Sequence, residues 1–551
     1  METMGILDKI KGFTRLGAQG EKQEKQLEDS LPKTPEGYMI NIRLPIMPYR
    51  EKPKGEIVER YTIYDPWAMV SIILSDSTSE YVYFIDETPL TEEEIKIYRK
   101  VIDFLIWEVG EMGKDEDPKE FIVREARRAI DLFKARAKRD YNISWDKILY
   151  YVEREVKGFG PINVLMLDPN LEDISCNGVG LPIYVYHRKY ESMPTNIIFQ
   201  NDEDLSSFVV RLAHMAGKHI SVAYPVLDAS LPGGHRLAAT FAKEISQKGS
   251  AFTIRKFRED PLTVVDMISL GTISPELAAY LWFLIEHKKT FLIMGVTGSG
   301  KTTLLNAILN LVRPNYKIVT IEETPEIRLP IKNWVQLVTR SSYAGGESKT
   351  GEITLYDLVK ISLRYRPDLI VVGEVRGSEA YVLFQAIATG HGGATTIHAE
   401  SIDAAIKRLT SPPMNIPESY IPLINSALMI ERVPVRSKDG TTKISRRVTK
   451  IWEIDKSVTP MIIGKWSPSR DMHLLTLDKS PMLNSIAEAL EISMSEILDE
   501  IRARAGFMRW LYYNNIRNYI DIASAIYKYY RSPKEILSLV EADLGHMGES
   551  I

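Results

Sequence analysis

A glycine-rich turn between an apolar run and a helix-forming run constrains this chain more than any other feature. Residues 290–303 read Thr-Phe-Leu-Ile-Met-Gly-Val-Thr-Gly-Ser-Gly-Lys-Thr-Thr, and Leu304, Leu305, Ala307 and Ile308 follow at once. An apolar strand, then Gly-x-x-x-x-Gly-Lys-Thr, then a helix is the pattern of a phosphate-binding P-loop. The sequence therefore predicts a nucleotide site.

The residue types of this loop suit ATP and Mg²⁺. Its glycines let backbone N–H groups turn inward, and the dipole of the following helix favours a polyanion at the same point. We expect Lys301 to reach the β- and γ-phosphates and Thr302 to ligate Mg²⁺. The predicted nucleotide-binding residues are Gly295, Thr297, Gly298, Ser299, Gly300, Lys301, Thr302 and Thr303. Kinases, helicases, transporters and secretion motors share this loop, so it does not identify the function.

Composition restricts the remaining classes. With 551 residues the chain is too long for one core and should contain two to four domains. Its net charge of −4 gives no overall basic field for nucleic acid. The single cysteine, Cys176, excludes disulfides within the chain and cysteine-cluster zinc sites, and it fits a reducing cytoplasm. We interpret it as a buried apolar residue rather than a reactive thiol.

No segment has the pattern of a signal peptide or of a membrane span. The most apolar stretch, residues 280–294, is interrupted by two lysines, a glutamate and a histidine. Residues 1–14 place Ile6, Leu7, Ile10 and Phe13 on one helical side. This side could contact a bilayer surface or a partner helix, and a frayed terminus is an equal alternative.

The first half of the chain reads as a linker, a helical region and a mixed region. After a polar linker (18–37) come strand-like pieces at 39–44 and 81–85 and helices at about 91–109, 117–139 and 144–156. Thr91 and Glu94 form a capping box at the first helix. Residues 158–258 combine short strands (183–186, 237–240, 252–254) with an amphipathic helix over 204–215, which predicts an α+β domain.

Beyond a hinge at 259–262, strands and helices alternate as in a parallel sheet wrapped by helices, and the chain from Leu474 is helical and tyrosine-rich. The predicted fold class is α/β, with a RecA-like P-loop ATPase domain, a preceding α+β domain and a helical N-terminal region. The predicted parts are a flexible segment (1–37), a β/helical region (38–156), an α+β nucleotide-clamp domain (157–260), the RecA-like domain (261–456) and a C-terminal helical region (457–551).

Two strands after the P-loop end in carboxylates. Lys317-Ile-Val-Thr-Ile-Glu-Glu-Thr-Pro-Glu delivers Glu322 and Glu323 at the carboxyl end of a strand, where open α/β sheets build their sites. One of them could orient and deprotonate an attacking water. Asp368-Leu-Ile-Val-Val-Gly-Glu ends in Glu374, as in a Walker B strand that serves Mg²⁺. Surface carboxylates after strands are the alternative in both cases.

Two histidines and two arginines complete the candidate site. His391 and His398 flank a glycine-rich strand, and His398 could donate to a γ-phosphate. We interpret them as functional rather than as packing residues, without a metal role. Arg236 and Arg255 come from the α+β domain and could stabilise charge during phosphoryl transfer. By spacing alone, a surface charge is the favoured interpretation of each arginine.

These signals occur in one order that resembles a known family. The P-loop is followed by a Glu-rich "Asp box" (321–326), a Gly-Glu Walker B motif (373–376) and a "His box" (390–398). This order resembles the type II/IV secretion ATPase superfamily, over roughly residues 158–455. Its Thr-Pro-Glu Asp box and its helical region resemble the archaeal branch, which includes the archaellum motor and archaeal pilus or secretion ATPases. The four-cysteine zinc subdomain of many bacterial members cannot exist here.

The resemblance implies a role for each candidate residue. Glu322 would activate water, Glu374 would join Thr302 at the Mg²⁺ site, and His391 and His398 would line the cleft. The Asp box has Glu-Glu where Glu-Asp is usual, so Glu323 remains the alternative base. Arg236 and Arg255 would reach the phosphates as the two domains close on ATP.

At the level of the assembly, the resemblance implies a homo-hexamer that pushes on an integral membrane platform protein from the cytoplasmic face of the cell membrane. An anionic lipid surface is a further candidate partner. A RecA-like nucleic-acid translocase or helicase is the alternative function. Its main support is a basic helix with Arg124, Arg127, Arg128, Lys134, Arg136, Lys138 and Arg139. We interpret this helix as a solvated face or a lipid contact and expect no nucleic-acid partner. A small-molecule kinase is a third alternative, but the sequence shows no obvious substrate lid and such an enzyme would not need 551 residues.

Overall fold

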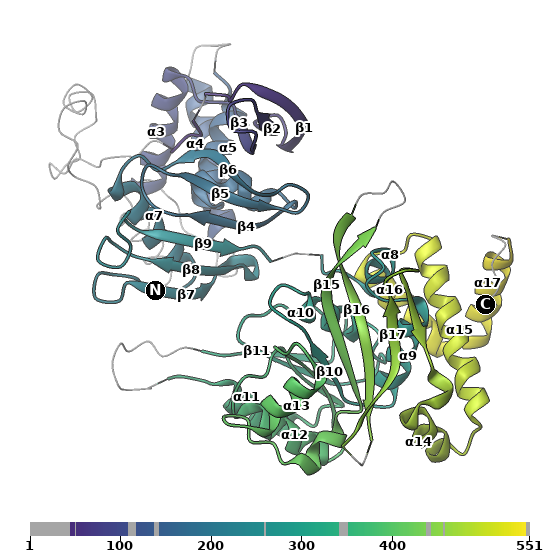
Figure 1. The fold of residues 1–551 in the computed structure, drawn as a ribbon. Helices are drawn as coiled ribbons and strands as arrows, with labels where there is room; N and C mark the ends of the chain where they lie inside the picture. The colour runs from purple at the N-terminus through teal and green to yellow at the C-terminus, as the bar shows by residue number, and fades with distance from the viewer. Residues whose placement is uncertain are drawn as a thin grey trace. The chain divides into compact units, whose positions relative to one another are not determined.

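The chain folds into two compact units, Met1–Arg258 and Glu259–Ile551 (Figure 1). The computed structural model describes residues 45–49, 51–107, 117–136, 143–257, 260–340, 351–436, 442–455 and 458–546. The predicted linker (18–37), the amphipathic segment (1–14) and the strand-like piece at 39–44 lie outside these residues.

The first unit is built on a nine-stranded sheet in the order β1-β2-β3-β6-β5-β4-β9-β8-β7. Its neighbours pair antiparallel except β3 and β6, which meet through one parallel pair, Tyr83 with Thr195. The predicted boundary at 156/157 falls inside this unit. The strands are β1 (Gly55–Tyr64), β2 (Ala68–Ser75), β3 (Tyr81–Glu87), β4 (Leu171–Cys176), β5 (Pro182–His187), β6 (Glu191–Ile198), β7 (Val226–Ser230), β8 (Arg236–Thr240) and β9 (Ala251–Arg255).

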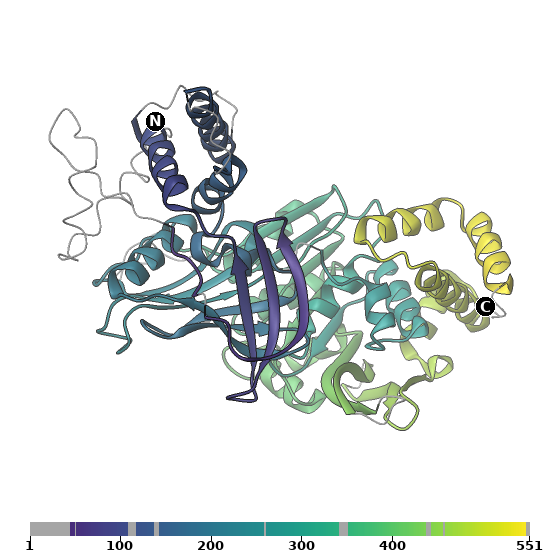
Figure 2. The same ribbon diagram turned by 90° about the horizontal axis from the view of Figure 1, so that it is seen from above.

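Three helices of this unit, α3 (Glu92–Trp107), α4 (Pro118–Arg136) and α5 (Trp145–Val156), pack together around a core of their own (Figure 2). The predicted capping box starts α3: the backbone N–H of Thr91 donates to Glu94 at 2.8 Å. The short α6 (Asn163–Leu167) precedes β4, and α7 (Asp202–Met215) follows β6. Cys176 is buried as expected, and burial raises the pKa of its thiol to about 11.

The second unit contains a nine-stranded sheet in the order β12-β11-β13-β14-β10-β15-β16-β17-β18. Strands β12 through β15 of this order are parallel, and β15 through β18 are antiparallel. The parallel strands are β10 (Phe291–Met294), β11 (Ile318–Glu322), β12 (Trp334–Val338), β13 (Leu369–Val372), β14 (Gly392–Ile397) and β15 (Ser426–Arg436). The antiparallel extension consists of β16 (Thr442–Ile454), β17 (Pro460–Ser467) and β18 (Met472–Leu475).

Helices cover both faces of this sheet, which is why β10 and β13 are apolar throughout. In β10, Phe291 and Ile293 pack in one core while Leu292 and Met294 pack in the other. The first core holds α8 (Val264–Ser269), α9 (Pro275–Glu286) and α10 (Lys301–Leu309). The second holds α11 (Leu355–Ser362), α12 (Glu379–Ala388) and α13 (Ile402–Thr410). The structure confirms the predicted α/β fold with a RecA-like P-loop domain after an α+β domain.

The C-terminal part differs from its prediction at the start. Residues 457–551 are predicted to be helical, yet β17 and β18 of this segment extend the sheet. Four helices follow: α14 (Pro481–Leu490), α15 (Met494–Tyr513), α16 (Tyr519–Arg531) and α17 (Pro533–His546). α15 packs on α9, and Trp282 of α9 lies against Tyr529 and Tyr530 of α16. The tyrosines of this tail that contact Trp282 therefore serve packing.

Among the residues that the structure describes, no helix is both long enough and apolar enough to cross a bilayer.

Candidate functional site: a P-loop at the carboxyl edge of the sheet

The P-loop connects β10 to α10 through glycines at which a side chain would be strained or crowded. Gly298 and Gly300 have φ of 74° and 97°, in the left-handed region that favours glycine. At Gly295 a Cβ atom would lie 2.4 Å from the carbonyl oxygen of Ile430 in β15. A loop of this conformation presents backbone N–H groups to an anion at the start of α10.

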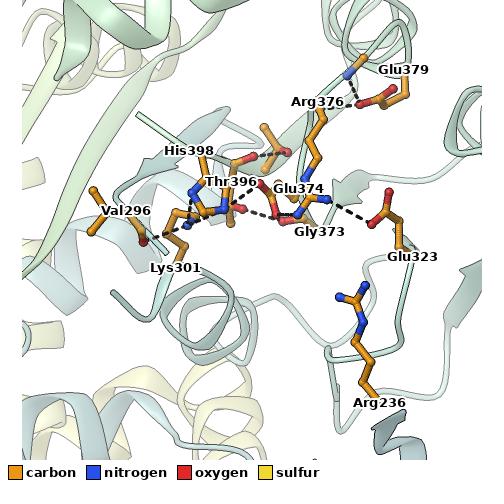
Figure 3. Close-up of polar contacts among 12 residues, drawn as sticks. Arg236, Val296, Lys301, Glu323, Gly373, Glu374, Arg376, Glu379, Thr396 and His398 are labelled. Atoms are coloured by element: carbon orange, nitrogen blue, oxygen red, sulfur yellow. Dashed lines mark hydrogen bonds and ion pairs between the residues drawn. The ribbon is translucent and has the colours of Figure 1, made fainter. Parts of the chain in front are cut away.

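Lys301 is the first residue of α10, and its side chain is largely buried. Its Nζ donates to the carbonyl oxygen of Val296 at 3.2 Å and lies 3.4 Å from Nε2 of His398 (Figure 3). Burial lowers the pKa of Lys301, and the nearby Glu374 carboxylate opposes this shift. Low local dielectric strengthens the attraction between such an ammonium and a phosphate.

Glu374 follows β13 and lies between two basic side chains (Figure 3). Its Oε2 accepts a hydrogen bond from Nη2 of Arg376 at 2.7 Å, and its Oε1 lies 3.1 Å from Nε2 of His398. Burial opposes ionisation of Glu374, but the Arg376 hydrogen bond and the neighbouring charges lower its pKa overall. The carboxylate is therefore anionic at neutral pH and chemically suited to a cation.

Arg376 connects three carboxylates around this edge of the sheet. Its Nη1 lies 3.5 Å from Oε2 of Glu323, in addition to the bond with Glu374. Its backbone N–H donates to Glu379, the first residue of α12, at 2.6 Å. Arg376 is not among the site residues predicted from the sequence, although its place two residues after the Walker B glutamate is a usable signal.

Glu322 ends β11 and is almost fully buried, unlike its neighbour Glu323. Its Oε1 accepts backbone N–H bonds from Glu326 and Ile327 at 2.8 and 2.9 Å, and Gln336 donates to its Oε2 at 3.3 Å. Burial nevertheless raises the pKa of Glu322 to about 7. A carboxyl with this pKa can exchange a proton at physiological pH.

Strand pairing brings these carboxylates to one edge. β11 and β13 are parallel neighbours, so Glu322 and Glu374 both follow the carboxyl ends of adjacent strands. Gly373 fits this arrangement because a Cβ atom there would lie 3.3 Å from Cγ of Glu322. Its carbonyl oxygen accepts a hydrogen bond at 2.8 Å from the Thr396 hydroxyl in β14, which fixes the third strand at the same edge.

The two predicted histidines lie at opposite ends of β14. His398 follows the strand at the site, whereas His391 precedes it. Nδ1 of His391 lies 3.1 Å from the carbonyl oxygen of Ala386 in α12 and 3.1 Å from Oγ1 of Thr389. The strand between them rises by about 3.3 Å per residue, so one cleft of this chain cannot hold both histidines. The structure thus corrects the expectation that they line one cleft.

The predicted arginines meet on one face of the first unit. Arg236 in β8 and Arg255 in β9 are direct cross-strand partners. Arg236 Nη2 lies 2.7 Å from Asp228, and Arg255 Nε lies 3.2 Å from Asp173. Arg255 is exposed and Arg236 is half-buried, and their acidic partners are not among the residues predicted from the sequence.

The remaining P-loop side chains differ in exposure. Thr297 is exposed, while Thr302 and Thr303 are half-buried at the first turn of α10. The hydroxyl of Ser299 is fully buried, with no hydrogen-bond partner among the described residues. An orphaned buried hydroxyl, a glycine cradle and a buried lysine fit the phosphates of a nucleotide.

Comparison with known proteins gives this geometry a family. The model of the type II/IV secretion system protein family matches residues 155–435, which is half of the chain and includes every candidate residue. The chain belongs to this family. It is an ATPase. The resemblance to the secretion ATPase superfamily is confirmed.

Individual relatives extend this result. Protein MJ0900 of the archaeon Methanocaldococcus jannaschii is 37% identical over 399 residues, covering 71% of this chain and 71% of that protein. The type IV secretion system protein PtlH of Bordetella pertussis is 31% identical over 285 residues, covering 47% of this chain and 83% of PtlH. The archaeal relative agrees with the resemblance to the archaeal branch.

Solved structures give more distant matches. The VirB11 ATPase of the Brucella suis type IV secretion system is 24% identical, covering 53% of this chain and 92% of VirB11, with a TM-score of 0.27. The pilus retraction motor PilT, solved with bound ADP, is 17% identical, covering 66% of this chain and 94% of PilT, with a TM-score of 0.37.

Proposed function

We propose that this ATPase is a motor that forms a homo-hexamer and drives an archaellum, a type IV pilus or a related secretion apparatus through an integral membrane platform protein. The observation that carries the proposal is the cluster of Lys301, His398 and Glu374 beside a complete P-loop. Such a cluster joins a phosphate-binding ammonium, a hydrogen-bonding imidazole and a carboxylate at one point. The family membership supports a secretion or pilus role for the hydrolysis.

In this proposal the chain's own residues divide the work on ATP. Lys301 and the backbone of Gly298 to Thr303 bind the phosphates, and Thr297 and Ser299 complete the loop. Thr302 and Glu374 would hold Mg²⁺, which neutralises charge that develops on the phosphates. Glu322 accepts a proton from the attacking water, since its pKa near 7 keeps it both basic and partly ionised.

His398 would donate to the γ-phosphate from its place between Lys301 and Glu374. His391, at the other end of β14, is predicted as a site residue from the sequence and has no role in this proposal. Arg236 and Arg255 would add positive charge from the first unit. Their shared face supports a joint role, because one phosphate group can accept from two guanidinium groups.

The same proposal places the motor at the inner face of the cell membrane, beside its membrane partner. A platform protein in the membrane would receive the motion, and an anionic lipid surface would assist docking.

The basic helix α4 supports a nucleic-acid alternative less than its composition suggests. Arg124 and Arg128 both contact Glu125, and Arg127 contacts Glu153, so acidic neighbours offset this charge. Arg136, Lys138 and Arg139 lie outside the residues whose side chains are described.

One experiment separates these functions. The ATP turnover of the full chain is measured alone and with anionic liposomes, single-stranded DNA, duplex DNA or RNA, with Lys301→Ala as the blank. We expect stimulation by lipid and indifference to each nucleic acid. Stimulation by nucleic acid without a lipid effect would favour the translocase instead. Mass photometry with and without ATP tests the hexamer, and a persistent monomer under both conditions would contradict it.

A further inference from the structure

Two arginines lie directly opposite one another on the hairpin that borders the P-loop. β15 runs parallel to β10, and β16 pairs with β15 so that Arg432 faces Arg446. Directly opposed residues of antiparallel strands carry their side chains on one face, and like charges in such a pair repel. An anion bound between them would remove this repulsion. Neither arginine takes part in the function proposed above.

Arg446 touches the P-loop itself. Its Nε and Nη2 both donate to the carbonyl oxygen of Gly298 at 3.3 Å. Its Cδ would lie 3.2 Å from a Cβ atom placed on Gly300. A guanidinium carries five N–H donors, so this contact with one carbonyl leaves donors for a phosphate.

No acidic side chain among the described residues neutralises the charge of Arg432 or Arg446. Both side chains are exposed, and across the described residues neither forms an ion pair. Arg447, the next residue of β16, provides the contrast: it is buried and lies 2.8 Å from Asp471. The structural arginine of this strand has an acidic partner, whereas the pair beside the P-loop is available to a ligand.

The order of strands indicates which end of the nucleotide lies here. The sheet runs β13-β14-β10-β15-β16, so Glu374 and His398 border the P-loop on one side and the hairpin borders it on the other. The reacting γ-phosphate must face the carboxylates. The α-phosphate and the nucleoside therefore extend toward β15 and β16.

We propose that Arg432 and Arg446 bind the α-phosphate and nucleoside end of ATP. The inference rests on the proposed function only in that the P-loop holds ATP. A guanidinium suits this end because its forked donors match a phosphate and its flat face stacks on an adenine base. Contacts with the non-reacting end are equal in the ground state and the transition state, so they lower KM without raising kcat.

The test uses the full chain with Arg432→Gln and Arg446→Gln. Arg436→Gln is the matched control, because Arg436 lies on the same hairpin, opposite Thr442 and away from the loop. Fluorescent ATP and ADP analogues give the nucleotide affinities. Competition of these analogues by pyrophosphate, which lacks a nucleoside, measures the phosphate affinity of the P-loop alone. We expect about tenfold weaker ATP and ADP binding for each variant, a higher KM and an unchanged kcat. Pyrophosphate affinity and the control stay unchanged.

Two results would overturn the inference. Unchanged nucleotide affinity in both variants means that the arginines do not contact the ligand. An equal loss of pyrophosphate affinity means that Arg446 acts by shaping the P-loop. Lys301→Ala keeps the two proposals apart: if it retains turnover, the assignment of the ATPase site fails. If it abolishes turnover while the arginine variants bind normally, only the arginine assignment fails.

Discussion

Nε2 of His398 lies 3.1 Å from Oε1 of Glu374, and the two side chains follow neighbouring parallel strands. The same imidazole is 3.4 Å from the ammonium of Lys301 (Figure 3). His398 therefore links the P-loop lysine to the carboxylate after β13. Burial, and then the charge of Lys301, lower the pKa of His398, so the ring is neutral at pH 7.

We expect His398→Ala to lower kcat by about 10- to 100-fold while ATP affinity changes little, because a neutral donor near the γ-phosphate acts mainly in the transition state. Steady-state kinetics and an equilibrium binding assay measure the two effects. His391→Ala is the matched variant at the other end of β14 and should have the smaller effect. A larger loss of activity in the His391 variant would contradict the assignment of His398 as the donor to the γ-phosphate.

The raised pKa of Glu322 leads us to expect that turnover depends on pH. Its pKa is raised to about 7, and the deprotonated form is the base, so kcat should rise as pH increases through 7. Glu322→Gln should lose this rise and at least about 100-fold in kcat, whereas Glu323→Gln should keep the pH profile. A retained pH profile in the Glu322 variant would assign the base elsewhere.

The raised pKa of Glu322 also affects the free energy of unfolding, which should fall over the pH range in which kcat rises. Since the folded pKa exceeds the unfolded value of 4.5, the folded state binds more protons between these pH values. Stability should therefore fall as pH rises from about 4.5 to 7, by on the order of 2 kcal/mol relative to Glu322→Gln. Urea unfolding at several pH values measures this. An identical pH dependence in the two proteins would contradict the assignment.

The P-loop glycines should differ in their tolerance of alanine. A Cβ atom at Gly298 meets no atom within 4 Å, so its alanine variant should lose only about 1 kcal/mol from the left-handed backbone. A Cβ atom at Gly295 would lie 2.4 Å from a carbonyl oxygen of β15, so that variant must shift the loop. We expect Gly295→Ala to abolish ATP binding and Gly298→Ala to retain a folded protein. Thermal unfolding and nucleotide titration compare them.

Arg504 is expected to stabilise the packing of the C-terminal helices on α9. It is buried, pairs with Glu286 and Glu500, and its guanidinium lies 4.7 Å from the Trp282 ring centroid. Arg504→Met should cost about 3–5 kcal/mol because it leaves Glu286 with only the longer contacts to Arg313 at 3.8 Å and Tyr530 at 3.4 Å. The double variant with Glu286→Gln should recover part of this loss. Denaturant unfolding tests both, and a neutral single variant would show that solvent reaches Glu286.

The local pattern was sufficient for much of the nucleotide site. Gly295 to Thr302 identifies a P-loop because only one arrangement of glycine, lysine and hydroxyl fits that strand-to-helix turn. Glu322 and Glu374 were found because apolar strands of a parallel sheet deliver their next residues to one edge. The helices that start at Thr91 and Ser144 carried recognisable caps or periodicity.

Contacts between distant segments were not contained in these patterns. His391 and His398 look equivalent in sequence, but the length of β14 separates them. Strands β17 and β18 belong to the sheet through pairing with β16, which local periodicity does not show. The raised pKa of Glu322 depends on burial by its neighbours, and the opposition of Arg432 and Arg446 depends on hairpin register.

The sequence by itself thus determined the P-loop, the order of carboxylate-bearing strands and the family, because backbone conformation and strand polarity are local properties. Only the tertiary structure decided which histidine stands beside Lys301, which glutamate is buried and which arginines border the loop. These depend on strand order and register, which bring together distant residues such as Gly298 and Arg446, 148 positions apart.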